Sequence, residues 1–187
     1  MAPYADTKEV LLCDDDHVYR LIEDMITAAS SHVRSRRIHI GMDEAMDLGL
    51  GKFLQKHGYE SGPSIIARHF SRVMEIIRRH GLSPMIWSDM YFRQASKTAD
   101  YYDLDAVIPQ EVIDKVPKDA SLVYWDYYHD TEEFYEDYIK RHKRFPNEIV
   151  FAGGLWTWVT FATHYGMAFR TSVPALRQCR KQQIRHV

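Results

Sequence analysis

The sequence has few cysteines, no long apolar run and almost no net charge, and each shortage excludes a class of protein. Cys13 and Cys179 are its only cysteines and lie far apart, which rules out a disulfide framework or a zinc knuckle. No apolar stretch approaches the ~20 residues that span a bilayer. The first ten residues, MAPYADTKEV, lack the apolar segment of a secretory signal. We therefore expect no membrane association, and the missing signal favours a cytoplasmic location.

The formal net charge of −2 gives no electrostatic reason to expect nucleic acid as a partner, because such proteins carry a basic excess on one face. Two motifs are also absent. Without G-x-G-x-x-G, a dinucleotide-binding domain is disfavoured, and without H-E-x-x-H we expect no zinc site. At 187 residues, 45% hydrophobic and 27% charged, the chain has the composition of a soluble globular protein. That length suits one domain or part of a larger one.

Helical periodicity alternates with short, continuously apolar runs along the chain. The pattern predicts helices over residues 14–32, 64–81, 131–145 and 172–187, the last of which runs into the beginning of a further strand at 185–187. It predicts strands over residues 37–42, 83–90, 120–128 and 147–158, and a small strand or turn with a short helical segment over 105–117. This alternation is typical of an α/β fold with a parallel sheet covered by helices.

Polar and aromatic side chains gather just past the predicted end of each strand. They are Asp43 and Glu44, Trp87 and Asp89, Trp125 to Tyr128, and Trp156 and Trp158. Functional groups at the carboxyl ends of successive strands are typical of a (β/α)8 barrel, which usually needs about 250 residues. Because we find only the four strands and the possible start of a fifth, the sequence predicts a partial barrel.

The stretch HIGMDEAMDLG (39–49) places two carboxylates, Asp43 and Glu44, side by side where a strand gives way to a loop. Retaining glycosidases commonly use two carboxyl groups about 5–5.5 Å apart across the sugar. Adjacent residues cannot easily straddle a sugar ring in that way. They suit a sugar whose own 2-acetamido oxygen attacks the anomeric carbon, with one carboxylate orienting the acetamide and the other doing the acid–base work.

These motifs resemble those of family 20 glycoside hydrolases, the β-N-acetylhexosaminidases. HIGMDE resembles the family's His-x-Gly-x-Asp-Glu motif, and the likeness continues through MIWSDM, LVYWDYYHD and FAGGLWTW. The chain looks most like the bacterial branch of these exo-acting enzymes. The resemblance implies that residues 1–187 are a fragment of a single (β/α)8 catalytic domain, roughly strands four to seven with their helices. It also implies terminal β-linked GlcNAc or GalNAc in glycans or glycoconjugates as the substrate, with no cofactor and no metal.

The resemblance implies a role for each matched position. Glu44 corresponds to the general acid/base, and Asp43 to the residue that polarises the acetamide nitrogen. Tyr127 corresponds to the tyrosine that hydrogen-bonds the acetamide oxygen, a choice over Tyr128 that strand alternation favours. Asp89 is expected to support the pocket or to reach a sugar hydroxyl. The pocket walls are expected to be Trp87, Trp125 and Trp156.

Simpler interpretations stand beside these. Asp43 and Glu44 would, without the family, more often be a loop-to-helix cap. Single tryptophans more often pack in a core, and only one of Trp156 and Trp158 is expected to touch sugar. His39 is expected to be a satisfied core histidine. The acidic cluster CDDDH (13–17) looks like a metal site, but capping of the following helix explains it better.

The chain does not match the family's arginine near the first strand or its last strand. A half barrel leaves sheet edges open, so the chain is expected either to be a fragment that self-associates through those edges or to have lost strands. The rival hypothesis is a catalytically incompetent barrel fragment that acts only as a sugar-binding or scaffold piece. A different barrel hydrolase would need a metal or nucleophile motif that the sequence lacks.

Overall fold

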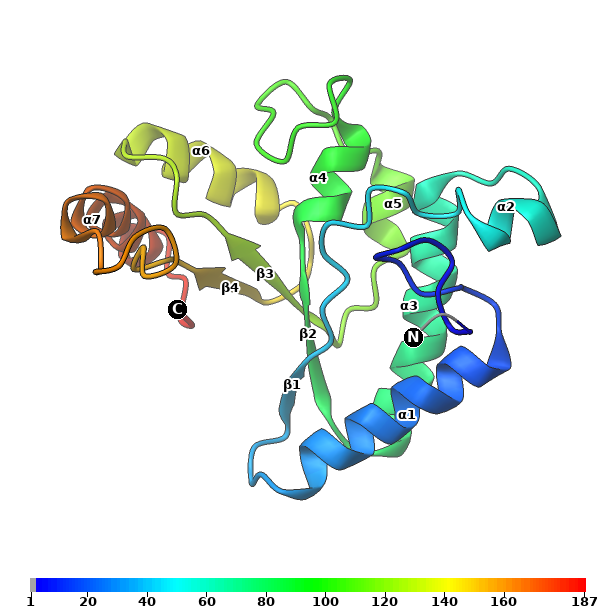
Figure 1. The fold of residues 1–187 in the computed structure, drawn as a ribbon. Helices are drawn as coiled ribbons and strands as arrows, with labels where there is room; N and C mark the ends of the chain where they lie inside the picture. Colours follow the sequence, from blue (N-terminus) through cyan, green and yellow to red (C-terminus); the bar gives the residue numbers. More distant parts are fainter. Residues whose placement is uncertain (1–2) are drawn as a thin grey trace.

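Four parallel strands form the sheet, and they follow the order of the chain, β1-β2-β3-β4. The computed structural model describes residues 3–187. Its strands are β1 (Arg37–His39), β2 (Ser83–Trp87), β3 (Ser121–Trp125) and β4 (Ile149–Ala152). Its helices are α1 (Asp16–Ser31), α2 (Lys52–His57), α3 (Gly62–Arg79), α4 (Asp89–Ala95), α5 (Gln110–Asp114), α6 (Glu132–His142) and α7 (Tyr165–Lys181) (Figure 1). The predicted α/β fold with a parallel sheet is confirmed.

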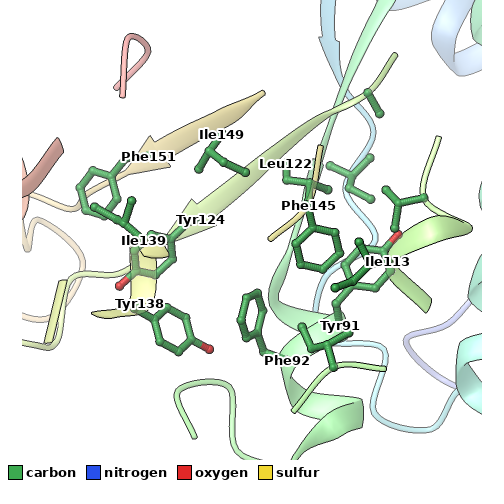
Figure 2. Packing of buried hydrophobic residues seen from close by; sticks show 14 of the residues in the cluster. Tyr91, Phe92, Ile113, Leu122, Tyr124, Tyr138, Ile139, Phe145, Ile149 and Phe151 are labelled. Atoms are coloured by element: carbon green, nitrogen blue, oxygen red, sulfur yellow. The ribbon is translucent and has the colours of Figure 1, made fainter. Parts of the chain in front are cut away.

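Alternate residues of the strands divide the sheet into two faces. Ile86, Leu122, Tyr124 and Phe151 are buried on one face. They pack with side chains from the helices, including Phe92, Tyr138 and Ile139 (Figure 2). The opposite face carries half-buried side chains such as Met85, Trp87 and Trp125. Function is therefore expected on this less covered face and at the carboxyl ends of its strands.

An ion pair across that less covered face links the two outer strands of the sheet, β1 and β4. Arg37 in β1 lies 3.4 Å from the carboxylate of Glu148, the residue directly before β4, and His186 lies 3.1 Å from the same carboxylate. His186 also forms a parallel bridge with Val150 in β4. The predicted beginning of a further strand at 185–187 is therefore confirmed at His186 alone, on the far side of β4 from β3.

The predicted strands are longer than the observed ones. The predicted strands end at residues 42, 90, 128 and 158, whereas the observed strands end at His39, Trp87, Trp125 and Ala152. Apolar and aromatic side chains continue past each strand, but the backbone leaves the extended conformation. Gly41 and Met42 both have φ of 72°, and α4 begins at Asp89. The side chains beyond each strand therefore lie in loops that converge on the site.

The helices α1, α3 and α6 confirm three predicted helices, and α5 confirms the short helical segment but not the strand alternative. α7 begins at Tyr165, earlier than the predicted 172, with Pro174 inside it. Proline is most common in the first turn of a helix, whereas Pro174 lies in the interior of α7. The short helices α2 and α4 were not predicted. None of the helices within residues 3–187 combines the length and apolar character needed to cross a membrane.

The acidic cluster at the start of α1 is used for capping and ion pairing. Asp15 is the N-cap residue, and its side chain accepts a hydrogen bond from the backbone N–H of His17 at 2.9 Å. Asp14 lies 2.8 Å from Arg68, and Asp16 lies 2.6 Å from Arg72. The capping interpretation is confirmed for Asp15, while its two neighbours join α1 to α3.

Candidate active site

The acid pair lies in the loop that follows β1. Asp43 and Glu44 are both exposed, and the loop reaches this position through residues with positive φ, including 47° at Glu44 itself. This backbone region is unfavourable for residues with a side chain. The backbone N–H of Glu44 donates a hydrogen bond to Oδ2 of Asp89 at 3.1 Å. Asp89 therefore helps to hold the strained loop that presents the two carboxylates.

Asp89 begins α4, so it does not continue the face of β2 that carries Trp87. Its side chain is buried, and among the described residues its Oδ1 has no hydrogen-bond partner. Burial raises the pKa of Asp89 to about 6; the hydrogen bond from Glu44 opposes this shift, and the charge of Asp43 adds to it. Of the two roles expected for Asp89, its geometry fits support of the pocket better than contact with sugar.

Trp87 ends β2 and lies against His39, with the two ring centroids 4.3 Å apart. Nδ1 of His39 accepts a hydrogen bond from the N–H of Gly41 at 3.1 Å. Its Nε2 is buried without a partner among residues 3–187, and burial lowers the pKa of this imidazole. The prediction of a fully satisfied core histidine is therefore wrong. His39 instead contacts Trp87 with its ring and holds the backbone at Gly41, just before the acid pair.

A second group of aromatic side chains follows β3 and β4. The Tyr127 ring lies 5.5 Å from that of Trp125 and 6.2 Å from that of Trp156. The indole Nε1–H of Trp156 donates to the carbonyl oxygen of Tyr127 at 2.8 Å. Trp156 also stacks on Trp158 at 5.5 Å, and Trp158 is the more exposed of the two. Three of the predicted site residues are thus brought together, while Trp87 lies with the acid loop.

Tyr101 connects the two groups and was missed from the sequence. Its ring lies 5.8 Å from that of Trp125. Burial raises its pKa; nearby Arg93 opposes this, and the charges of Glu44, Asp89 and Asp43 add to it. The hydroxyl group is buried without a partner among the described residues. The only sequence signal was a tyrosine pair, residues 101–102, in the segment after α4.

The charge of Glu44 also reaches Tyr127. Burial raises the pKa of Tyr127 to about 12, with further contributions from Tyr128 and then from the Glu44 carboxylate. The site thus combines two exposed carboxylates with a wall of aromatic rings and a tyrosine hydroxyl. Carboxylates can transfer protons or orient an N–H group, and aromatic faces can stack on the apolar face of a sugar.

Comparison with known proteins identifies the family. The family model described as glycosyl hydrolase family 20, catalytic domain, matches residues 2–141. The match includes the acid loop, Trp87, Asp89, Trp125 and Tyr127, and it ends before β4 and Trp156. No curated protein matches the chain. Because the family match covers well over half of the sequence, the chain belongs to glycosyl hydrolase family 20.

Proposed function

We propose that the chain is part of an exo-β-N-acetylhexosaminidase that removes terminal β-linked GlcNAc or GalNAc from glycans or glycoconjugates. In this proposal residues 1–187 are a fragment of one (β/α)8 barrel, roughly strands four to seven with their helices. Support comes from the four parallel strands in chain order, each followed by helical segments, and from the parallel bridge at His186.

The proposed reaction is substrate-assisted. Glu44 donates a proton to the glycosidic oxygen while the carbonyl oxygen of the 2-acetamido group attacks the anomeric carbon and the glycosidic bond breaks. Asp43 accepts a hydrogen bond from the acetamide N–H and stabilises the positive charge that develops on the ring formed by this attack. Water then attacks the anomeric carbon and gives a proton to Glu44, while the bond from that carbon to the acetamide oxygen breaks. This step re-forms the acetamido group, restores the acid and gives net retention.

The aromatic side chains have complementary roles in this proposal. The Tyr127 hydroxyl donates a hydrogen bond to the acetamide oxygen and fixes its direction of attack. Trp87, Trp125 and Trp156 form walls against the apolar faces of the sugar. Asp89 supports the acid loop from behind through the N–H of Glu44.

The observation that carries the proposal is that the acid loop after β1 and Tyr127 after β3 both follow the carboxyl ends of strands in one parallel sheet. The charge of Glu44 also adds to the raised pKa of Tyr127, although the two residues are 83 positions apart in the chain. Substrate-assisted hydrolysis requires an acid and an acetamide-binding hydroxyl to act on one sugar at the same time.

The test is hydrolysis of chromogenic β-GlcNAc, β-GalNAc and β-glucose substrates by this chain. Cleavage of the acetamido sugars alone is expected, because the glucoside lacks the internal nucleophile. Equal cleavage of the glucoside would contradict the mechanism. Binding of N-acetylglucosamine without any turnover would instead favour the sugar-binding or scaffold hypothesis for this chain.

A further inference from the structure

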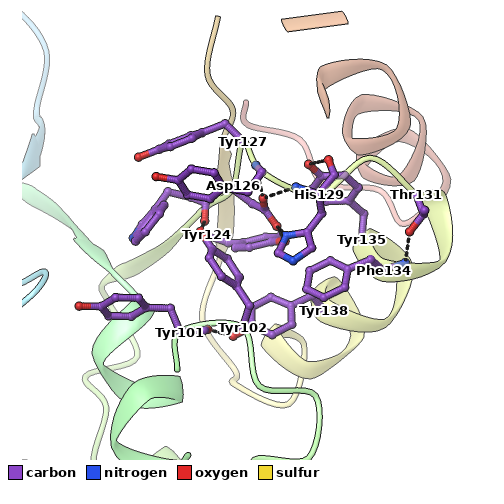
Figure 3. Close-up of polar contacts among 12 residues, drawn as sticks. Tyr101, Tyr102, Tyr124, Asp126, Tyr127, His129, Thr131, Phe134, Tyr135 and Tyr138 are labelled. Atoms are coloured by element: carbon purple, nitrogen blue, oxygen red, sulfur yellow. Dashed lines mark hydrogen bonds and ion pairs between the residues drawn. The ribbon is translucent and has the colours of Figure 1, made fainter. Parts of the chain in front are cut away.

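A buried carboxylate lies directly behind the aromatic wall. Asp126 follows β3, and its side chain is almost fully buried. Oδ2 accepts hydrogen bonds from the Tyr124 hydroxyl at 2.7 Å and from Nδ1 of His129 at 2.8 Å. Oδ1 accepts from the backbone N–H groups of Tyr128 at 2.9 Å and His129 at 3.3 Å (Figure 3). Both oxygens are therefore occupied by donors, which makes the loop after β3 rigid.

His129 is held in place from several directions. Its ring stacks on Phe134 with the centroids 3.5 Å apart and the planes at 6°, and the edge of Tyr102 lies against it. Its backbone carbonyl accepts a hydrogen bond from the Tyr135 hydroxyl at 2.7 Å. Because a carboxylate oxygen only accepts, Nδ1 of His129 carries the hydrogen in its contact with Asp126.

These contacts control the backbone on both sides of Tyr127. The N–H of Asp126 donates to the carbonyl of Ala152 in β4 at 3.1 Å, and the N–H of Tyr128 is bound by the Asp126 side chain. Between them, the Tyr127 carbonyl accepts the Trp156 indole N–H. A displacement of this loop would therefore move both the Tyr127 ring and the Trp156 indole.

We propose that Asp126 and His129 are positioning residues that fix Tyr127, and through its carbonyl Trp156, in the sugar-binding geometry. This inference rests on the proposed hexosaminidase function for its effect on catalysis, but the coupling of His129 to Trp156 is a property of the fold. Neither residue is proposed to touch the sugar. The hydrogen bond between them, rather than the ring stack on Phe134, is the decisive contact.

Two substitutions of His129 separate these contacts. His129→Phe keeps an aromatic ring for Phe134 and removes the donor to Asp126. His129→Asn loses the ring but can place an amide N–H near the position of Nδ1. We expect His129→Phe to lower kcat/KM on the acetamido substrate about 10- to 100-fold, because small displacements in a site have effects of that size. We expect His129→Asn to lower kcat/KM on the same substrate much less.

A second measurement does not depend on activity. The Trp156 indole N–H, assigned in ¹⁵N-tryptophan spectra with Trp156→Phe, should exchange slowly with water in the original chain and in His129→Asn. It should exchange faster in His129→Phe. If the original chain cleaves no acetamido sugar, the proposed function fails while this measurement still decides the positioning role.

The proposal would be overturned if the Trp156 indole N–H exchanged as slowly in His129→Phe as in the original chain. Equal exchange rates in His129→Phe and His129→Asn would also overturn it. Circular dichroism shows whether His129→Phe folds. If it does not, Tyr124→Phe removes a different donor to the same Asp126 oxygen and undergoes the same exchange measurement, with faster exchange of Trp156 expected and unchanged exchange contradicting the proposal.

Discussion

Glu44 and Asp43 differ in what they are expected to contribute, although they are neighbours in one loop. Both side chains are exposed, so their amide variants should alter the free energy of unfolding very little. Glu44→Gln removes the proton donor and should lower kcat by about 10²–10⁴-fold. Asp43→Asn keeps a polar group beside the acetamide and should lower kcat somewhat less than Glu44→Gln does. The measurement is kcat on the chromogenic acetamido substrates, and a near-original kcat in either variant would contradict its assigned role.

Asp89 should make the stability of the chain depend on pH. Its pKa is raised from 3.8 to about 6, so the folded state binds the proton more tightly than the unfolded state. The free energy of unfolding therefore falls as pH rises from about 4 to about 6, by an amount on the order of 3 kcal/mol. Below that pH range, Asp89 is protonated in both states and this effect vanishes.

Asp89→Asn removes the ionisation but leaves an oxygen to accept the Glu44 N–H. We expect this variant to be more stable than the original chain above pH 6, and the difference to shrink towards pH 4. Urea unfolding at several pH values measures it, with Asp24→Asn on the exposed face of α1 as the control. A difference that does not change with pH would show that burial does not govern the Asp89 carboxyl.

The loop between β4 and α7 approaches the aromatic wall closely because residue 154 is glycine. A Cβ at this position would lie 2.9 Å from Cγ of Tyr127 and 2.5 Å from Cη2 of Trp158. The added Cβ would also lie 3.0 Å from Cβ of Tyr127, and a rotation of the Tyr127 side chain cannot move that atom away. The loop after β4 can therefore pack this closely against Tyr127 and Trp158 only with glycine at position 154.

Gly154→Ala should displace Tyr127, raise KM for the acetamido substrate, and destabilise the fold by about 1–3 kcal/mol. Gly166→Ala is the matched control, because its Cβ would meet His164 at an ordinary 3.5 Å. Kinetics and thermal unfolding of both variants measure the effect. Equal KM values for the two variants would mean that the close approach does not shape the site.

Two surfaces of the chain remain apolar and uncovered. β1 is an edge strand, and a cavity of about 470 Å³ lies beside it. It is lined largely by apolar side chains of α1, α3, β1 and residues 9–13 and 40–48, and it includes Asp43 of the acid loop. On α7, exposed apolar side chains form a row at Tyr165, Phe169, Val173 and Leu176. Such edges and patches favour pairing with another chain.

We therefore expect this chain to self-associate as its concentration rises. Replacing Phe169 and Val173 together by lysine should weaken the association, because both side chains are exposed on α7 and neither is needed in the core. Sedimentation velocity over a range of concentrations measures it. A monomer at every concentration would contradict the expectation.

Local patterns in the sequence were enough to predict the alternation of helices and strands and the loop that carries Asp43 and Glu44. An apolar run or a helical stripe is encoded within a few neighbouring residues, so each strand was found from its own sequence. The end of each strand could not be predicted in this way. The apolar and aromatic side chains beyond Trp87, Trp125 and Ala152 resemble strand residues, although the backbone there is no longer extended.

The parts that depend on contacts between distant segments were decided by the tertiary structure. Asp89 supports Glu44 from 45 residues away, and Trp156 binds the carbonyl of Tyr127 from 29 residues away. Tyr101 meets Asp89 and Trp125 only in the folded chain, where the three residues line one small cavity. The sequence pattern specifies which chemical groups follow each strand. Only the packing of the sheet and helices specifies which of these groups meet, because hydrogen bonds and burial depend on position in space.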